Sequence, residues 1–165
     1  MPTRLDEFTL RPITPADDAA VAAVIRQVMP EFGASGPGFA INDPEVDAMF
    51  RAYQGPKAKY FVVDGHGKVH GGGGFNALKG GDGSICEVQK MYLLPSARGT
   101  GVGYKLLDTI INQARAAGFR HCYLETLGNM TAARALYAKF GFKPLSAPMG
   151  ATGHHGCDAW YSRDL

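Results

Sequence analysis

The sequence predicts an α/β fold in which a mixed, largely antiparallel sheet carries helices on both faces. Two observations lead to this prediction. Between residues 59 and 74, two β-like runs flank a short turn, which is typical of an antiparallel hairpin. Between residues 85 and 140, the order strand, helix, strand, helix indicates a crossover connection, and such a connection joins parallel strands.

A short strand and an amphipathic helix are predicted first. Residues 8–11 are β-like, and Thr14 followed by Pro15 can cap and begin a helix. Apolar residues then repeat at helical spacing until Pro30, where we expect the helix to stop. These apolar residues are Ala20, Val21, Val24, Ile25 and Val28.

Residues 31–42 are rich in glycine, serine and proline and predict a loop, after which Asp43-Pro44 begins a second helix. One face of that helix carries Val46, Met49, Phe50 and Tyr53. The simplest interpretation of this apolar face is that it packs into the core.

The predicted hairpin has strands over residues 59–63 and from Val69 onward, joined by a turn at residues 64–67. Four consecutive glycines, residues 71–74, lie in its second strand. Missing side chains in a strand indicate a bulge or the close approach of another backbone. An anion-binding cradle is a second interpretation, but a bulged strand is the simpler one.

The rest of the chain alternates strands and helices. Strands are predicted over residues 85–94, 122–125, 142–145 and 159–162. Helices are predicted from after Arg98 to Gly118 and over residues 130–140, because apolar residues there repeat at the helical period. We therefore expect strands 85–94 and 122–125 to form the parallel pair.

Length and charge restrict the function classes. A chain of 165 residues with a net charge of +2 predicts one domain over residues 1–165 and argues against a nucleic-acid partner. No apolar run approaches the roughly 20 residues that span a bilayer, and charged residues such as Arg4 and Asp6 stand where a signal peptide would be apolar. Three cysteines without CxxC spacing fit a reducing compartment. We therefore expect no membrane partner and a cytoplasmic location.

A glycine-rich turn, residues 98–103, lies between a predicted strand and an amphipathic helix. Glycines allow close backbone approach to a ligand, and the N–H groups at a helix start favour an anion. A phosphate-bearing ligand would fit this turn, although a tight connection that binds nothing is the alternative. The spacing matches neither a P-loop nor the full G-x-G-x-x-G of a dinucleotide fold.

Together with its surroundings, this turn resembles the GNAT superfamily of N-acetyltransferases. Arg98-x-x-Gly101-x-Gly103 is similar to the R/Q-x-x-G-x-G/A signature of that family. Several further motifs stand in the family's order, which is far more specific than one glycine-rich turn. They are the run from Glu87 to Pro95, Leu124-Glu125-Thr126, Ala133-x-x-Leu136-Tyr137 and Gly141-Phe142.

The resemblance implies that acetyl-CoA, or another acyl-CoA, is the co-substrate. Its pyrophosphate would lie on the turn and its pantetheine along the preceding strand, in a gap where the two parallel strands splay apart. The implied contact residues are Met91, Tyr92, Leu93, Arg98, Gly99, Thr100, Gly101, Val102, Gly103 and Tyr104. The sequence permits the splay, because Pro95 ends hydrogen bonding close to the point where the strand would part from its neighbour.

Two residues are candidate catalytic groups by this resemblance. Glu87 stands where many members carry a glutamate that accepts the amine proton, and strand alternation places it on the face of Met91 and Leu93. Tyr137 resembles the tyrosine that protonates the leaving thiolate. The structural alternatives are an ion-paired strand glutamate and a core aromatic residue.

The sequence departs from the family pattern in two places. Asn129 lies one residue before the position of the family's cofactor-contacting amide, which Met130 occupies, so we interpret Asn129 as a cap or loop residue. The carboxy-terminal segment around His154, His155 and Cys157 matches no general family motif. These residues lack zinc-site spacing, so we expect no metal and assign the segment to loop structure or substrate contact.

The leading functional hypothesis is an N-acetyltransferase that moves an acetyl group to a primary amine of a small molecule or peptide by direct attack in a ternary complex. Cys86 and Cys122 fall in predicted strands as buried thiols, which disfavours a cysteine intermediate. The alternative is a catalytically silent CoA-binding regulatory module. Homodimerisation is left open, and the sequence does not name the acceptor.

Overall fold

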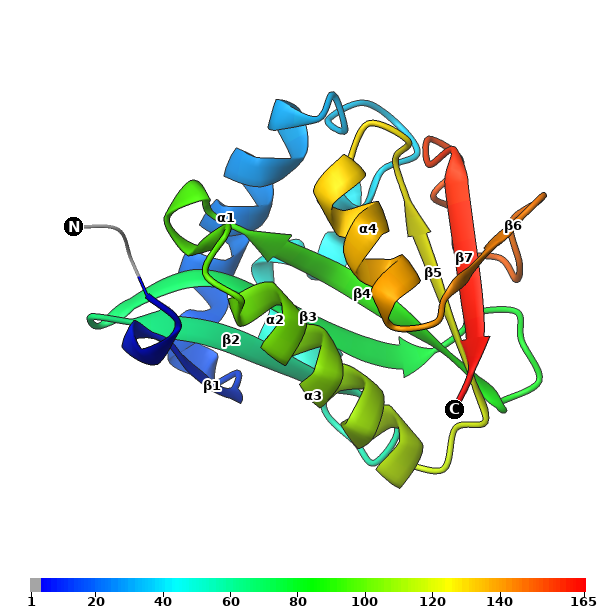
Figure 1. Cartoon of the computed structure of the whole chain (residues 1–165), viewed down its shortest axis with the longest axis horizontal. Helices are drawn as coiled ribbons and strands as arrows, with labels where there is room; N and C mark the ends of the chain where they lie inside the picture. The colour runs from blue at the N-terminus through cyan, green and yellow to red at the C-terminus, as the bar shows by residue number, and fades with distance from the viewer. Residues whose placement is uncertain (1–3) are drawn as a thin grey trace.

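The computed structural model describes residues 4–165, and a seven-stranded sheet runs through it in the order β1-β2-β3-β4-β5-β7-β6 (Figure 1). The strands are β1 (Thr9–Pro12), β2 (Lys59–Gly65), β3 (Lys68–Ala77), β4 (Ile85–Leu93), β5 (His121–Thr126), β6 (Lys143–Leu145) and β7 (Ala159–Asp164). Pairing is parallel between β4 and β5 and antiparallel at the other junctions. The predicted mixed sheet and its parallel pair are therefore confirmed.

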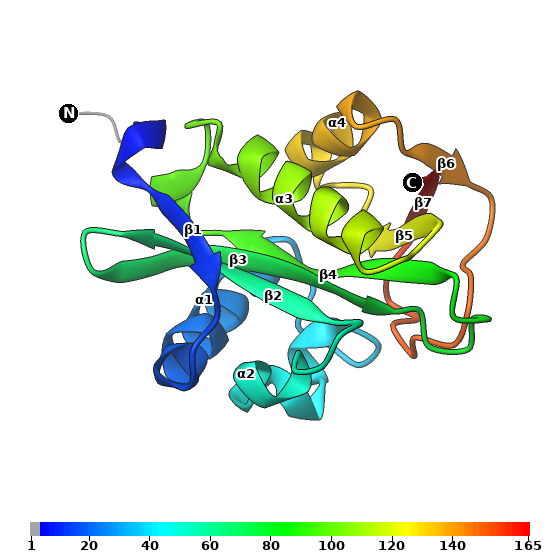
Figure 2. The ribbon, with the colours of Figure 1, turned by 90° about the horizontal axis from the view of Figure 1, so that it is seen from below.

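Helices cover both faces of the sheet, as predicted. The helices are α1 (Asp18–Glu31), α2 (Met49–Ala52), α3 (Val102–Ala116) and α4 (Thr131–Lys139). Figure 2 shows α1 and α2 on one face and α3 and α4 on the other. Each face buries its own apolar cluster, one around α3 with Phe75 and Leu106, and one around α1 with Val62 and Met49. No helix within residues 4–165 is long and apolar enough to cross a membrane.

The start of α1 is fixed by a buried carboxylate. Asp17 accepts two hydrogen bonds from the Arg11 guanidinium, at 2.8 and 2.9 Å, and one from the Thr14 backbone N–H at 2.7 Å. Thr14 and Asp17 form a capping box for the turn Pro15–Asp17 that leads into the helix. The expected start at Thr14-Pro15 is therefore correct, whereas Pro30 lies inside the last turn of α1 instead of after it.

The second predicted helix is broken into two short pieces. Residues Pro44–Asp47 form a 3-10 turn and α2 begins only at Met49, because Ala48 has non-helical backbone angles (φ −142°, ψ 47°). The Asp18 carboxylate accepts the Phe50 N–H at 2.8 Å and so binds the start of the second piece. The apolar face is nevertheless buried as expected, with Val46 and Met49 almost fully enclosed.

The four glycines of β3 admit close neighbours on both sides. A Cβ on Gly72 would lie 2.6 Å from the Tyr60 ring, and one on Gly73 would lie 3.0 Å from the Met91 Cβ. The register between β3 and β4 shifts between Gly72 and Gly74, so Lys90 and Met91 together oppose Gly73. A bulge was predicted in the glycine strand itself; the structure has one at this junction, but its extra residue belongs to the neighbouring strand β4.

Candidate functional site

The glycine-rich turn leads directly into α3. Gly99 and Gly101 have left-handed φ values of 73° and 90°, and Gly101 occupies the capping position before Val102. Such φ values favour glycine, which has no Cβ to clash with the backbone. The first N–H groups of a helix have no carbonyl one turn behind them, and the helix dipole adds partial positive charge there. The turn therefore offers amide donors suited to an anion.

An open cleft of about 380 Å³, which we call the outer cleft, lies beside this turn. Its walls come from the end of β4, the turn, α4 and the end of α1. Residues that line it include Met91, Tyr92, Leu93, Arg98, Gly99, Gly101, Gly103, Tyr104, Phe32, Met130, Leu136 and Tyr137. Most of the predicted co-substrate residues are thus brought together with Tyr137.

Two of the predicted co-substrate residues do not line the outer cleft with their side chains. The Thr100 hydroxyl donates to the Ala97 carbonyl at 2.7 Å, and the Val102 side chain is buried in the core. Arg98 lines the cleft, but its guanidinium pairs with Glu31 at 2.9 Å and donates to the Leu93 carbonyl at 3.0 Å. Arg98 therefore ties the turn to α1 and to the end of β4.

The parallel strands separate early. The last paired residues are Glu87 and Tyr123, although β4 continues to Leu93 and β5 to Thr126. The expectation that Pro95 marks the parting is therefore wrong, because pairing ends well before that residue. Lys90, with a left-handed φ of 49°, lies in the β4 bulge beyond the last pair.

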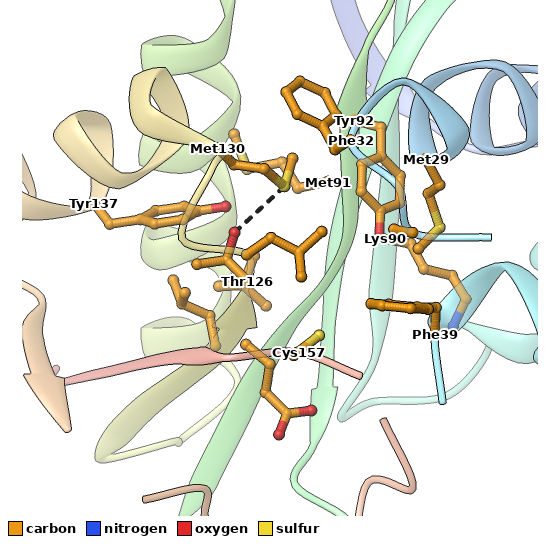
Figure 3. A pocket seen from close by; sticks show the side chains of 15 residues that line it. Met29, Phe32, Phe39, Lys90, Met91, Tyr92, Thr126, Met130, Tyr137 and Cys157 are labelled. Atoms are coloured by element: carbon orange, nitrogen blue, oxygen red, sulfur yellow. Dashed lines mark hydrogen bonds between the residues drawn. The ribbon is translucent and has the colours of Figure 1, made fainter. Parts of the chain in front are cut away.

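A second, narrower space lies in the gap between the separated strands, and we call it the inner chamber; Figure 3 shows its part beside Tyr137. It consists of two adjoining hollows of about 50 and 40 Å³. Its lining residues include Met29, Phe39, Ala40, Glu87, Val88, Gln89, Lys90, Tyr92, Leu124, Glu125, Thr126, Met130, Tyr137, His154 and Cys157. It shares Phe32, Met91, Tyr92, Met130 and Tyr137 with the outer cleft, so the two spaces meet.

Tyr137 lies where the two spaces meet. Its ring packs against Phe142 and Tyr161 in the core, while its hydroxyl points into the inner chamber (Figure 3). Burial holds the pKa of Tyr137 above its usual value, so the hydroxyl carries its proton at neutral pH. Tyr137 is thus a core aromatic residue, as in the alternative interpretation, and its protonated hydroxyl faces the cavity.

Glu87 lies at the inner end of the chamber and not on the face that alternation predicted. Met91 and Leu93 pack into the core beneath α3, whereas Glu87 is hydrogen-bonded on the opposite side of the sheet. Its Oε1 accepts from the Gln89 side chain at 2.7 Å, and Tyr53 in turn donates to Gln89 at 2.7 Å. The bulge at Lys90 adds one residue and so reverses the alternation between Glu87 and Met91.

The environment of Glu87 favours a neutral carboxyl. The side chain is 4% exposed, and burial raises its pKa to about 7 against the opposing effect of the Gln89 hydrogen bond. The nearby Glu125 carboxylate acts in the same direction as burial. A carboxyl with this pKa can both take and release a proton near neutral pH.

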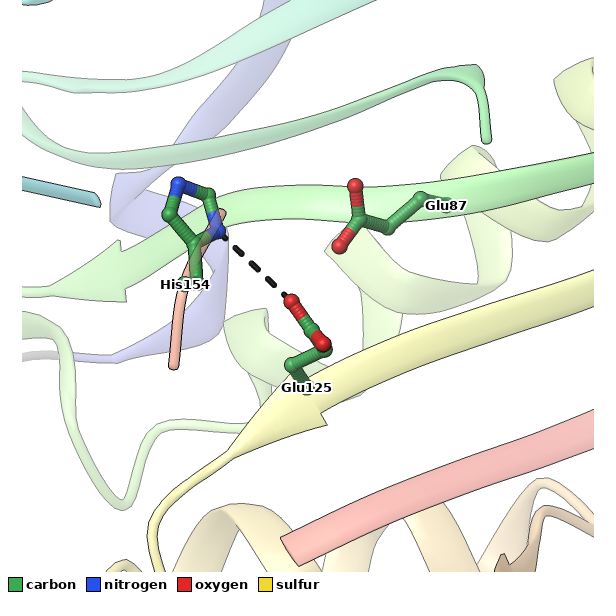
Figure 4. A group of neighbouring side chains, drawn as sticks. All are labelled: Glu87, Glu125 and His154. Carbon is green, nitrogen blue, oxygen red and sulfur yellow. Dashed lines mark ion pairs between the residues drawn. The ribbon is translucent and has the colours of Figure 1, made fainter. Parts of the chain in front are cut away.

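Glu87 is surrounded by a cluster of charged groups, and the sequence patterns did not reveal this cluster. His154 bonds Asp43 through Nε2 at 2.9 and 3.0 Å, and its Nδ1 lies 3.6 Å from Glu125 (Figure 4). Lys90 contacts Asp43 and also Glu45, each at 2.8 Å. A charged residue inside a strand predicted to be buried, as at Lys90 and Glu125, is the sequence signal that could have found this cluster.

The segment around His154 supplies side chains to this cluster. The two histidines point apart: His154 faces Asp43 and Glu125, and the His155 ring packs beside Gly38. The Cys157 thiol lines the inner chamber, where burial raises its pKa to about 12, so it is protonated and a poor nucleophile at neutral pH. Asn129 donates to the Phe32 carbonyl at 3.0 Å instead of capping α4.

Ligand atoms of Glu87, Glu125 and His154 lie within 4.8 Å of one another, a spacing that could suit a metal ion. Both nitrogens of His154, however, face carboxylates, and the bond to Asp43 followed by that to Glu125 raises the pKa of His154 to about 9. A protonated imidazole has no lone pair for a metal.

Comparisons with known proteins agree on one family. The model of the acetyltransferase (GNAT) family matches residues 25–142. A relative from Escherichia coli (strain K12), the uncharacterized N-acetyltransferase YjgM, is 42% identical over 157 residues, which cover 94% of each chain.

Solved structures share the fold. A GNAT-family acetyltransferase from Staphylococcus aureus Mu50 has a TM-score of 0.81 at 19% identity, covering 96% of this chain and 99% of that one. A phosphinothricin acetyltransferase from Sinorhizobium meliloti, solved in complex with AcCoA, has a TM-score of 0.76 at 27% identity, covering 96% and 89%.

Proposed function

Because this chain belongs to the GNAT family of acetyltransferases, we propose that it transfers the acetyl group of acetyl-CoA to a primary amine by direct attack in a ternary complex. The observation that carries this proposal is the continuity of the site. The outer cleft beside the glycine-rich turn shares Tyr137 with the inner chamber, and Glu87 lines the far end of that chamber. The outer cleft takes the co-substrate and the inner chamber takes the acceptor.

The turn binds the pyrophosphate of acetyl-CoA. Amides between Gly99 and Tyr104 and the dipole of α3 supply the favourable charge. The pantetheine arm follows β4 along Met91, Tyr92 and Leu93, whose edge no longer pairs with β5. Amides on this free edge polarise the thioester carbonyl and stabilise the negative charge that develops on its oxygen.

Glu87 and Tyr137 divide the proton transfers. The Glu87 carboxylate accepts a proton from the bound ammonium, directly or through a water, and so frees the nitrogen lone pair. The C–N bond then forms as the C–S bond breaks. The Tyr137 hydroxyl donates its proton to the departing thiolate and recovers one from the amine nitrogen through solvent. The high pKa of the tyrosine and the pKa of about 7 at Glu87 suit these opposite roles.

The test of this proposal is a turnover assay on a broad amine panel. Amino acids, polyamines, aminoglycosides and peptide amines are incubated with acetyl-CoA, and free thiol release and acetylated product are followed together. We expect acetyl-CoA-dependent product with at least one amine. Calorimetric binding of CoA without turnover on the whole panel would instead indicate the silent CoA-binding module.

A further inference from the structure

Two segments, residues 36–43 and 152–158, contact each other over the inner chamber. The Gly156 N–H donates to the Gly38 carbonyl at 3.0 Å, and His154 bonds Asp43 across the same junction. Packing there is tight, because a Cβ on Gly156 would lie 2.6 Å from the Phe39 ring. Segments 36–43 and 152–158 therefore cover one side of the chamber, and an extended polypeptide could enter from that side only by separating them.

Carboxylates outnumber cationic groups around the chamber. Lys90 and His154 carry positive charge, while Asp43, Glu45 and Glu125 carry negative charge and Glu87 adds a further one when ionised. Both cations are already occupied by carboxylates of this cluster. Three ionised carboxylates against two cations leave the cluster with net negative charge, and Glu125, which shares His154 with Asp43, faces the inner end of the cavity beside Glu87.

The spacing of these two carboxylates fits a single ammonium group. Their nearest oxygens lie no more than 4.8 Å apart. A tetrahedral nitrogen that donates two charge-assisted hydrogen bonds of about 2.8 Å spans roughly 4.6 Å between the acceptors. One substrate nitrogen can therefore contact both carboxylates at once.

We propose that the acceptor is a small, free cationic amine whose ammonium group binds between Glu125 and Glu87, with Glu125 as the residue that anchors it. This inference rests on the proposed function and assigns it a substrate class. The two hollows of the inner chamber are small, which favours a compact acceptor, and the walls nearer Tyr137 are apolar, with Met29, Phe39 and Met130 among them. Segments 36–43 and 152–158 cover one side of the chamber, which favours a free amine over a peptide-borne lysine.

The surroundings of Glu125 suit an anchor that stays ionised. Thr152 donates to its Oε1 at 2.6 Å and Tyr123 donates to its Oε2 at 2.8 Å. Burial alone would raise the pKa of Glu125, but these hydrogen bonds and the contact with His154 lower it below the ordinary value. Glu125 thus keeps its charge while Glu87 takes the proton, so one carboxylate holds the substrate and the other reacts.

The test compares Glu125→Gln with wild type in steady-state kinetics. The small amines are putrescine, n-butylamine and free amino acids, and the comparison substrates are short lysine-containing peptides. We expect the KM for the best small amine to rise roughly 10- to 100-fold, as for the loss of a charge-assisted hydrogen bond. The KM for acetyl-CoA should stay within about twofold, because ground-state binding of the other substrate is untouched.

Two further variants keep the outcome interpretable. Asp108→Asn removes an exposed carboxylate on α3 and should leave both KM values unchanged. Glu125→Asp keeps the charge and should recover part of the amine affinity lost in Glu125→Gln. If Glu125→Gln does not fold, as judged by loss of acetyl-CoA binding in calorimetry, Glu125→Asp alone should still raise the amine KM several-fold.

Four results would overturn the inference. An unchanged amine KM in Glu125→Gln would show that Glu125 is not the anchor, and so would an equal rise in both KM values. Peptides that react with a higher kcat/KM than every small amine would exclude the substrate class while leaving acetyl transfer intact. No transfer to any amine would overturn the proposed function as well.

Discussion

Replacing Glu87 by glutamine should change how the stability of the protein depends on pH. A carboxyl whose pKa is about 7 in the folded protein and about 4.5 in the unfolded chain binds more protons when folded between these values. Its contribution to stability is therefore fully present below pH 4.5 and is lost as the pH rises through 7. Integrated from pH 5 to pH 8, the loss is about 2 to 3 kcal/mol.

Glutamine has the same shape and does not titrate, so Glu87→Gln removes this loss. We expect the free energy of unfolding of the variant, measured relative to wild type, to rise by about 2 to 3 kcal/mol between pH 5 and pH 8. Urea denaturation of both proteins at several pH values within this window measures the difference. A constant difference between variant and wild type across the window would refute the claim that Glu87 is buried with a raised pKa.

Three further variants test the parts of the site and the fold. Gly101→Val places a β-branched residue at φ 90°, so the turn must shift, and we expect acetyl-CoA affinity in calorimetry to fall roughly 10-fold or more; unchanged affinity would contradict the anion site. Tyr137→Phe should lower kcat roughly 10-fold or more without moving the acidic limb of the pH profile, whereas full activity would leave the tyrosine as a core residue only. Asp17→Asn should cost about 2 kcal/mol in urea denaturation at pH 7, because it disrupts the Arg11 pair. Arg11 holds the pKa of Asp17 at about 2, so this cost should shrink only as the pH falls from about 4 toward 2, and an equal cost at pH 2 would contradict it.

Most of the fold could be predicted from local patterns. The structure confirms the hairpin, the helices with apolar repeats and the strand–helix–strand order of residues 85–140. Each of these was visible in the spacing of apolar residues within one segment. The second helix was predicted as continuous because its apolar face is continuous. The helix is interrupted at Ala48, and the Asp18 carboxylate of α1 binds the Phe50 N–H just beyond the break; a contact with another element leaves no mark on the local pattern.

The site was predictable where one segment carries it. The turn at residues 98–103 and the Tyr137 helix could be identified, and the structure places them on one cleft. The face of Glu87 was predicted wrongly, because a single bulged residue, Lys90, reverses strand alternation and no residue type signals it unambiguously. Asp43, Glu125 and His154 come from three distant segments, so only the folded chain brings them together.

The central claim is that Glu87, at the inner end of the inner chamber, is the catalytic base. The pH dependence of kcat/KM in wild type and Glu87→Gln tests this claim most directly. This parameter reports groups that titrate in the free enzyme and the free substrate, so acceptors with different amine pKa values must be compared. We predict a wild-type acidic limb centred near pH 7 that does not move with the acceptor. In Glu87→Gln the limb should be absent and turnover roughly 100-fold lower, with acetyl-CoA affinity preserved. Full activity of Glu87→Gln with an unaltered profile would contradict the claim and leave this glutamate a structural residue.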